Sequence, residues 1–236
     1  MNILRNMVRR AASLLLELPC EGCGVAVAAG ANSLCQRCRE RLTTVPEPRC
    51  PVCGGVNQGI LRCCPDCLEA GDRPWSAAAT LFLYEGLARQ LILEFKFSGH
   101  TGLAALFAEL AAREVAGFDC RFDYIVPVPL HWLRRLRRGY NQCELFGREL
   151  SRLTGIPFAD VLHRVGRGGH QSRRDRAERL AAMRGAFRPK GRRIAGKNLL
   201  LVDDVFTTGA TLTAAAGVLV SAGAARVAVL TLARRA

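Results

Sequence analysis

The chain lacks any stretch of about 18 uncharged apolar residues, so the sequence predicts no membrane span. It also lacks the pattern of an export signal. The arginines near its start are followed by only a few apolar residues, Leu14 to Leu16, before Glu17, and no small-residue cleavage site follows. We therefore expect residues 1–18 to form a short amphipathic helix and the protein to be cytoplasmic.

Proline is scarce, with 10 in 236 residues, while 50% of the residues are apolar and charges of both signs are present. This composition is typical of a globular protein and argues against a disordered one. A chain of this length can bury one ordinary core and still form a smaller module. No internal repeat appears beyond pairs of cysteines.

Acidic residues are the charged type in deficit, with 20 against 34 basic residues and a formal net charge of +14. Residues 1–75 are nearly neutral, whereas residues 131–193 carry 17 basic and 5 acidic side chains. Nearly the whole excess therefore lies in one segment, which would suit an anionic ligand or a nucleic-acid backbone. Trp132, Tyr140 and Phe187 lie within it and could either stack on bases or belong to the core.

Eight of the 11 cysteines form four CxxC pairs. The pairs are Cys20 and Cys23, Cys35 and Cys38, Cys50 and Cys53, and Cys64 and Cys67. In a chain without an export signal such pairs indicate zinc ligands before disulfides, because a CxxC turn places two thiolates on one side of a tetrahedron. We expect consecutive pairs to form two structural zinc sites in a double zinc ribbon over residues 19–74. Interleaved pairing stays open, and Cys63 competes with Cys64, although the spacing favours Cys64.

Beyond residue 75, segments with strand and helix patterns alternate. Strand patterns occur at residues 78–86, 122–130, 157–165, 197–206 and 226–233. Helix patterns occur at residues 87–99, 103–115, 141–155 and 209–224, with Asn141 as an expected N-cap and Gly155 after the helix end. The basic segment 166–193 predicts a mobile loop with a short helix near residues 177–183. Apolar strands alternating with helices indicate an α/β domain over residues 75–236, with a parallel sheet covered on both faces.

The stretch LLLVDDVFTTGATL, residues 199–212, carries the most specific pattern. A turn of threonine and glycine before a helix presents N–H groups and hydroxyls to an anion such as a phosphate. Asp203 and Asp204 precede this turn at the carboxyl end of a strand, where open α/β sheets bind ligands. Carboxylates repel a phosphate, so they would face a diol or a metal ion instead. A ribose phosphate meets both demands, and a polar turn capped by threonines is the alternative.

This stretch resembles the phosphoribosyl-pyrophosphate signature of type I phosphoribosyltransferases. The order of four CxxC pairs, LYEG, LEFKFSG, IVPVPL, RRGYNQ, ERLAAMRGAF and the signature resembles the ComF family of phosphoribosyltransferase-like proteins, which is associated with competence and DNA uptake. The resemblance covers almost the whole chain from about residue 14. It implies a type I phosphoribosyltransferase fold, a parallel sheet flanked by helices, that binds phosphoribosyl pyrophosphate or another ribose phosphate with Mg²⁺.

The resemblance also implies roles for individual residues. Asp203 and Asp204 would hold the ribose hydroxyls as the catalytic pair. The turn that would wrap the 5′-phosphate consists of Thr207, Thr208, Gly209, Ala210 and Thr211. The loop PLHWLRRLRRGYNQ would bind pyrophosphate, and its cations are Arg134, Arg135, Arg137 and Arg138. Lys96 is either another phosphate contact or a solvated lysine at a helix end.

A loop that closes over the reacting centre would fall at residues 166–184. Its candidate residues are Gln171, Arg176, Arg179 and Arg184. The sequence departs from the family pattern here, because Ala182 follows Arg179 where asparagine is usual and SRRD replaces a more apolar stretch after Gln171. The remaining candidates are His131 and His170, which we expect to be solvated, and Cys120 and Cys143, which we expect to be small buried hydrophobes.

Three functions fit these patterns. The protein could transfer a phosphoribosyl group to an unidentified acceptor, through an oxocarbenium-like state at C1. It could handle single-stranded DNA during transformation together with DNA-uptake proteins. It could also sense phosphoribosyl pyrophosphate without turning it over. The expected role is in DNA uptake or utilisation, and the reaction itself stays open.

Overall fold

A computed structural model describes residues 18–27, 34–59, 61–165, 185–191 and 194–235. The helix expected over residues 1–18 lies almost wholly outside these ranges. So do the expected closing loop at residues 166–184 and its short helix. None of the described helices combines the length and the apolar character needed to cross a membrane.

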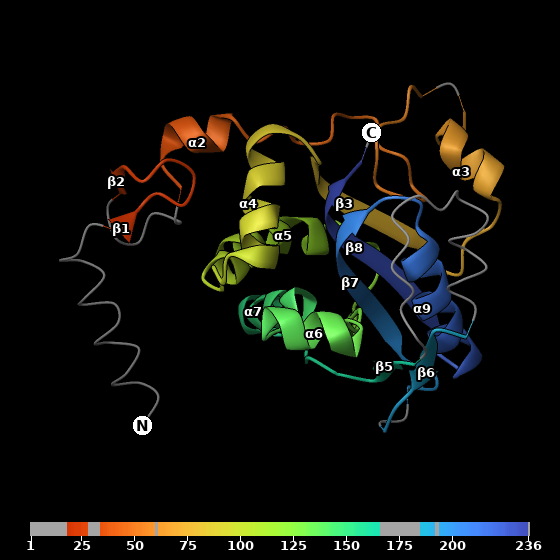
Figure 1. Cartoon of the computed structure of the whole chain (residues 1–236). Coiled ribbons are helices and arrows are strands. Elements are labelled where there is room, and N and C mark those ends of the chain that lie inside the picture. Colours follow the sequence, from red (N-terminus) through yellow and green to blue (C-terminus); the bar gives the residue numbers. More distant parts are fainter. Residues whose placement is uncertain (1–17, 28–33, 60, 166–184, 192–193, 236) are drawn as a thin grey trace.

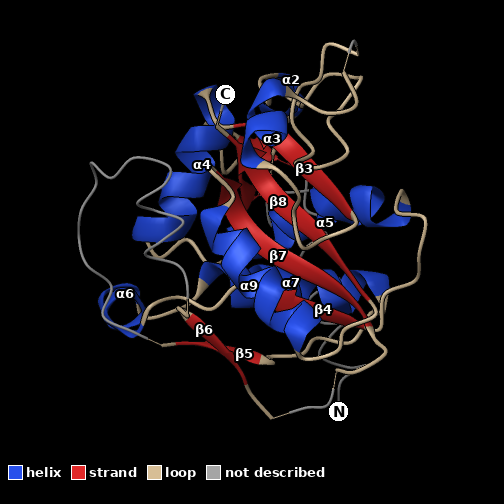
Figure 2. Cartoon of the chain, turned by 90° about the vertical axis from the view of Figure 1, so that its right-hand side faces the viewer, coloured by secondary structure: helices blue, strands red, loops and turns tan. Residues whose placement is uncertain are grey.

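A four-stranded sheet forms the centre of the molecule, with the strand order β3-β8-β7-β4 (Figures 1 and 2). Its strands are β3 (Ala77–Leu83), β4 (Tyr124–Pro127), β7 (Asn198–Phe206) and β8 (Arg226–Arg234). All three pairings are parallel, and Asp203 of β7 lies beside Thr231 of β8. The expected parallel sheet is therefore confirmed.

Helices cover both faces of this sheet. They are α4 (Gly86–Phe97), α5 (Leu103–Ala116), α7 (Gln142–Thr154) and α9 (Ala210–Ser221). Leu200 and Val202 of β7 pack in one apolar cluster with α4, α5 and α7, whereas Leu199 and Leu201 pack with α9. Successive residues of a strand point to opposite faces, so a strand covered on both sides must be apolar throughout.

The eight paired cysteines form two groups. The first cluster is Cys20, Cys23, Cys35 and Cys38, and the second cluster is Cys50, Cys53, Cys64 and Cys67. Within each cluster the sulfur atoms all lie within 4.8 Å of one another. This confirms consecutive pairing and selects Cys64 over Cys63.

Short elements carry these ligands. They are β1 (Leu18–Pro19), β2 (Ala26–Val27) and α2 (Gln36–Glu40) around the first cluster, and α3 (Pro65–Ala70) at the second. Figure 1 shows β1, β2 and α2 on one side of the molecule, and α3 and α9 on the other.

The second cluster is built directly onto the sheet. The Thr80 hydroxyl of β3 donates to the Cys53 carbonyl oxygen at 3.0 Å and pairs with the Thr231 hydroxyl of β8 at 2.8 Å. Gly54 has φ of 67°, and a Cβ atom there would lie 2.6 Å from the Thr80 nitrogen. Only glycine therefore lets this knuckle lie against β3.

Two short elements, α6 (Trp132–Arg138) and β6 (Phe187–Pro189), depart from the expected pattern. Strand β5 (Leu162–Arg164) lies within the strand expected at residues 157–165, but it pairs antiparallel with β6 and does not join the parallel sheet. Helix α6 occupies the stretch expected to be a loop, and His131 caps it by accepting from the Leu133 nitrogen at 3.3 Å. His131 is buried, so the expectation that it is solvated is wrong. Phe187 is fully buried and belongs to the core.

Candidate ligand-binding site

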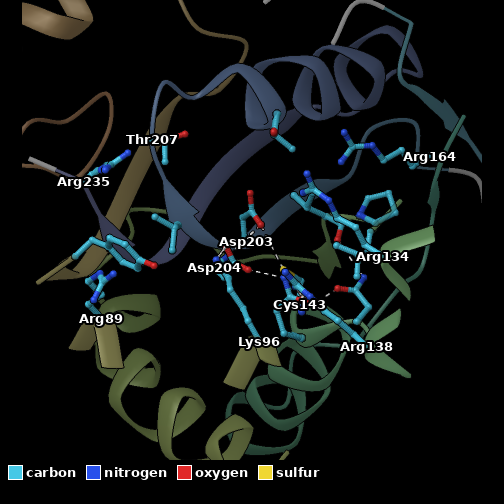
Figure 3. Close-up of a pocket in the computed structure, with 18 residues that line it drawn as sticks. Arg89, Lys96, Arg134, Arg138, Cys143, Arg164, Asp203, Asp204, Thr207 and Arg235 are labelled. Atoms are coloured by element: carbon cyan, nitrogen blue, oxygen red, sulfur yellow. Dashed lines mark hydrogen bonds and ion pairs between the residues drawn. The ribbon is translucent and has the colours of Figure 1, made fainter. Parts of the chain in front are cut away.

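A pocket of about 460 Å³ opens at one edge of the sheet (Figure 3). Val128 follows β4, Asp203 and Asp204 belong to the end of β7, and Arg235 follows β8. Because the three strands are parallel neighbours, their carboxyl ends bring these residues together. This is the edge at which open α/β sheets bind ligands.

Positive charge dominates the pocket. Two carboxylates line it, together with six basic residues: Arg89, Lys96, Arg134, Arg138, Arg164 and Arg235. Burial and the charge of Arg134 lower the pKa of Arg164, and burial is also the main cause that lowers the pKa of Arg138. Guanidinium groups whose pKa is lowered in this way gain from an anion beside them. The pocket is therefore suited to a ligand with several negative charges.

Asp204 is held by two partners. Lys96 of α4 lies 2.9 Å from its Oδ1 atom, and Gln142 of α7 donates a hydrogen bond to its Oδ2 atom. Asp204 is 8% exposed, so these partners offset most of the cost of burying its charge. Lys96 is thus an ion-pair partner at the pocket rather than a solvated lysine.

Asp203 has a different environment. Its Oδ1 atom accepts from the Cys143 thiol at 3.3 Å and from the Asp204 backbone nitrogen at 2.9 Å. Burial first, and then the charge of Asp204, raise the pKa of Asp203 to about 7. Burial and both carboxylates raise the pKa of the Cys143 thiol, which therefore stays protonated and donates.

The N-terminus of α7 fixes the residues beneath the two carboxylates. The Asn141 Oδ1 atom accepts from the Cys143 nitrogen at 3.1 Å, which confirms the expected N-cap. Its Nδ2 atom donates to the Val128 carbonyl oxygen at 3.2 Å. Asn141 thereby ties the start of α7 to the end of β4 and places Gln142 and Cys143 at the pocket floor.

The turn between β7 and α9 presents only part of itself to the pocket. Thr207 and Thr211 line the pocket, whereas the Thr208 hydroxyl accepts from the Ala210 nitrogen at 3.3 Å. Gly209 has φ of 75°, and a Cβ atom there would lie 2.8 Å from the Phe206 ring. The turn therefore requires glycine at this position for both conformation and space.

The predicted site residues separate into three groups. Those that line the pocket are Lys96, Arg134, Arg138, Asp203, Asp204, Thr207 and Thr211. Those outside its lining are Arg135, which pairs with Glu144 at 2.8 Å, Arg137, which lines a neighbouring cavity, and Thr208, Gly209 and Ala210. Those outside the described residues are His170, Gln171, Arg176, Arg179 and Arg184.

Sequence reasoning missed several lining residues, namely Tyr84, Arg89, Gln142, Cys143, Arg164 and Arg235. Gln142 and Cys143 follow the predicted N-cap directly, and Arg235 follows a predicted strand, so their positions could have been found from the topology. Arg89 and Arg164 come from the side of a helix and from a three-residue strand. Nothing in their local sequence marks them.

The two cysteine clusters fit Zn²⁺. The Cys35 backbone nitrogen donates to the Cys20 sulfur at 3.2 Å, and the Cys64 nitrogen donates to the Cys50 sulfur at 3.4 Å. Backbone amides that donate to sulfur are expected where the sulfur is a thiolate ligand. Four cysteines fill each tetrahedron, which is the ligand set of a structural zinc site.

Comparison with known proteins shows the domain that the chain contains and the proteins that it resembles. The family model of the phosphoribosyl transferase domain matches residues 141–236. A DNA utilization protein YhgH from Escherichia coli K12 is 31% identical over 229 residues, covering 93% of this chain and 99% of that protein. Competence protein F from Haemophilus influenzae is 30% identical over 191 residues, covering 77% and 81%. Competence protein ComFC from Bacillus subtilis is 29% identical over 200 residues, covering 82% and 80%.

The chain therefore belongs to the ComF/YhgH family of competence and DNA utilization proteins, which carry a phosphoribosyl transferase domain. The resemblance found in the sequence motifs is confirmed.

Proposed function

We propose that the pocket binds phosphoribosyl pyrophosphate together with Mg²⁺. The observation that carries this proposal is the placement of adjacent carboxylates and a threonine turn at the end of β7, in a pocket lined by six cations. Asp203 and Asp204 would accept from the ribose hydroxyls, and the turn from Thr207 to Thr211 would hold the 5′-phosphate. Arg134 and Arg138 would meet the pyrophosphate.

The residues present fit Mg²⁺ only in company with the ligand. Mg²⁺ prefers oxygen ligands and is commonly bound through one or two carboxylates plus substrate phosphates. Lys96 and Gln142 already engage both oxygens of Asp204. We therefore expect Mg²⁺ to enter with the pyrophosphate, whose charge it would offset.

Transfer of the phosphoribosyl group is the reaction that these contacts would support. The bond between C1 of the ribose and the pyrophosphate oxygen would break, with its electron pair leaving on pyrophosphate. The acceptor would bond to C1 and release a proton. Arg134 and Arg138 would stabilise the charge that grows on the leaving group. A sensor that binds the same ligand without turnover would use the same residues.

Calorimetry with phosphoribosyl pyrophosphate and Mg²⁺ tests the binding proposal. We expect the Asp203→Ala/Asp204→Ala variant to bind at least about tenfold more weakly than the wild type, because it loses the acceptors for two hydroxyls. Asp119→Ala, at an exposed carboxylate outside the pocket lining, is the matched control and should bind normally. Failure of the wild type to bind would refute the proposal.

Release of pyrophosphate separates transfer from sensing. Magnesium-dependent release in the presence of one member of an acceptor panel would establish transfer. Tight binding with no release across the panel would favour the sensor.

A second candidate function is contact with single-stranded DNA, which would accord with relatives named as DNA utilization and competence proteins. The specific observation is the surface of α6, where Trp132 is 63% and Leu136 76% exposed beside the helix arginines. Phe97 is 67% exposed, and the Arg138 guanidinium lies 4.7 Å from its ring centre. Exposed aromatic side chains among arginines are typical of surfaces that stack bases and follow a phosphate backbone.

Binding of a fluorescent oligonucleotide at several salt concentrations tests this role. We expect Trp132→Ala to weaken binding about fivefold through lost stacking and Arg137→Ala to weaken it while reducing the salt dependence. Arg152→Ala, at an exposed arginine of α7, is the control. Affinity that is independent of salt and of these residues would contradict the role.

A further inference from the structure

The backbone of the threonine turn contacts the segment that follows the second cluster. Arg73, six residues after Cys67, donates from Nη2 to the Thr208 carbonyl oxygen at 3.1 Å. Its Nη1 atom donates to the Thr213 hydroxyl, in the first turn of α9, at 2.7 Å. One guanidinium thus bridges the turn and the helix that follows it.

The contact with Thr208 orients a peptide group. A trans peptide is planar and directs its N–H opposite to its C=O. Holding the Thr208 carbonyl toward Arg73 therefore directs the Gly209 N–H away from Arg73. A turn that binds a phosphate does so through such N–H groups, so their direction determines whether the turn can bind.

Arg73 is itself held by the second cluster. Its guanidinium lies 5.6 Å from the centre of the Trp75 ring, and the Trp75 Nε1 atom donates to the Val52 carbonyl oxygen at 2.6 Å. Val52 lies between the ligands Cys50 and Cys53. The indole therefore connects Arg73 to the first knuckle of the second cluster.

A second connection runs through Phe206, the last residue of β7. The Trp75 and Phe206 rings meet edge to face with centres 6.3 Å apart. Buried Arg234 lies over the same Phe206 ring at 5.4 Å, donates to the Cys53 sulfur and pairs with Asp66 at 2.6 Å. Phe206 in turn fills the space beside Gly209 that a Cβ atom would need.

From these contacts we propose that Arg73 is a positioning residue for the turn from Thr207 to Thr211, and that the second cluster anchors it. Binding of a metal ion by the four cysteines of the second cluster then fixes the conformation of the turn. The first cluster, which has the same four thiol ligands, lies near β1, β2 and α2 on the other side of the molecule from α9 (Figure 1). It serves as an internal control.

Hydrogen exchange of the ligand-free protein tests the anchoring. In Arg73→Ala we expect amides of residues 206–213 to exchange at least about tenfold faster, because two hydrogen bonds from a charged group are lost. Arg62→Ala, at an exposed arginine beside the second cluster, should leave these amides unchanged. Thr213→Val should reproduce part of the effect, while Thr213→Ser keeps the hydroxyl and should match the wild type. Unchanged exchange in Arg73→Ala would overturn the proposal.

A second experiment compares the loss of a ligand from each of the two clusters. Cys64→Ser should raise exchange in residues 206–213, and Cys35→Ser should not, with zinc content and circular dichroism measured on both. The arginine and threonine variants keep both clusters intact, so they test the positioning role of Arg73 even where a cysteine variant fails to fold. Equal effects of the two cysteine variants on this segment would contradict the anchoring.

The ligand arm rests on the proposed function. We expect Arg73→Ala to bind ribose 5-phosphate at least about fivefold more weakly and inorganic pyrophosphate within about twofold of the wild type, since only the 5′-phosphate would contact the turn. Equal weakening of both ligands would count against a positioning role. If the wild type binds neither ligand, the proposed function fails, whereas hydrogen exchange still decides the anchoring.

Discussion

At the scale of single residues, the site is organised by two adjacent carboxylates with unequal surroundings. Asp204 has a lysine and an amide as partners, whereas Asp203 has a thiol and a backbone amide. The Lys96 ammonium offsets the burial of the Asp204 carboxylate. Among the residues that the structure describes, Asp203 has no cationic partner of this kind, and burial is the main cause that raises its pKa.

This asymmetry predicts how stability depends on pH. The pKa of Asp203 is raised from 3.8 to about 7 in the folded protein. Its contribution to the free energy of unfolding is therefore fully present below its pKa in the unfolded chain, and is lost as pH rises through 7. Asp203→Asn removes this loss. Relative to the wild type, we expect the free energy of unfolding of this variant to rise by on the order of 1 kcal/mol between about pH 6 and pH 8.

Urea denaturation at the two pH values measures this effect. The groups that face Asp203 are Asp204, Cys143, Lys96 and Arg164, and the substitution leaves all four in place. Asp119→Asn should show no such gain. A constant difference between variant and wild type across this pH range would mean that Asp203 does not titrate between pH 6 and pH 8.

The sequence predicted the carboxylates and the threonine turn because they are contiguous, and one local pattern contains them. It could not predict Arg89 or Arg164. Arg89 lies on a helix side and Arg164 on a short strand, and only the tertiary arrangement brings both to the pocket. Convergence of this kind leaves no local pattern.

At the scale of elements, α7 links the sheet to the site through its N-cap residue. Asn141 caps the helix and donates to the end of β4, and both contacts are buried. The helix start is therefore fixed relative to β4, and Gln142 can reach Asp204.

Asn141→Ala should cost about 2 kcal/mol of unfolding free energy, because it removes a cap and leaves the Val128 carbonyl oxygen without this donor. Asn141→Ser retains an oxygen that can cap the helix and should cost less. Thermal or urea denaturation checks the order. Equal costs for the two variants would show that the bond to Val128, and not the cap, carries the energy.

The long elements followed from their local sequence, β7 from a continuous apolar run and α4, α5 and α9 from helix patterns. Helix α6 did not, because none of its residues is buried and it has no apolar face toward the core. Its seven residues are also too few for a periodic pattern to stand out. Strand β6 was missed because three residues in a basic segment carry no alternation.

At the scale of the whole molecule, the two cysteine clusters differ in burial. All four ligands of the second cluster are buried, whereas Cys23 of the first is exposed and Cys35 is half-buried. Spacing alone predicted both clusters, since CxxC pairs are local. That the second cluster, and not the first, is connected to the turn from Thr207 to Thr211 depends on the tertiary fold.

Removal of metal should therefore occur in two phases. We expect a chelator with a coloured zinc indicator to release zinc quickly from the first cluster and slowly from the second, with the slow phase coinciding with a fall in Tm. Cys23→Ser should abolish the fast phase only. Release in a single phase that coincides with unfolding would contradict the difference.

The paired hydroxyls of Thr80 and Thr231 have a consequence for how this family can diverge. Because β3 and β8 are parallel neighbours, a slip of one residue would turn both hydroxyls away from each other and leave the Cys53 carbonyl without its donor. A buried apolar contact tolerates many side chains of similar volume, but this three-way contact does not. Substitutions in the interior of the sheet are thus constrained by a knuckle in another part of the chain, and Thr80 and Thr231 should change together or remain as they are.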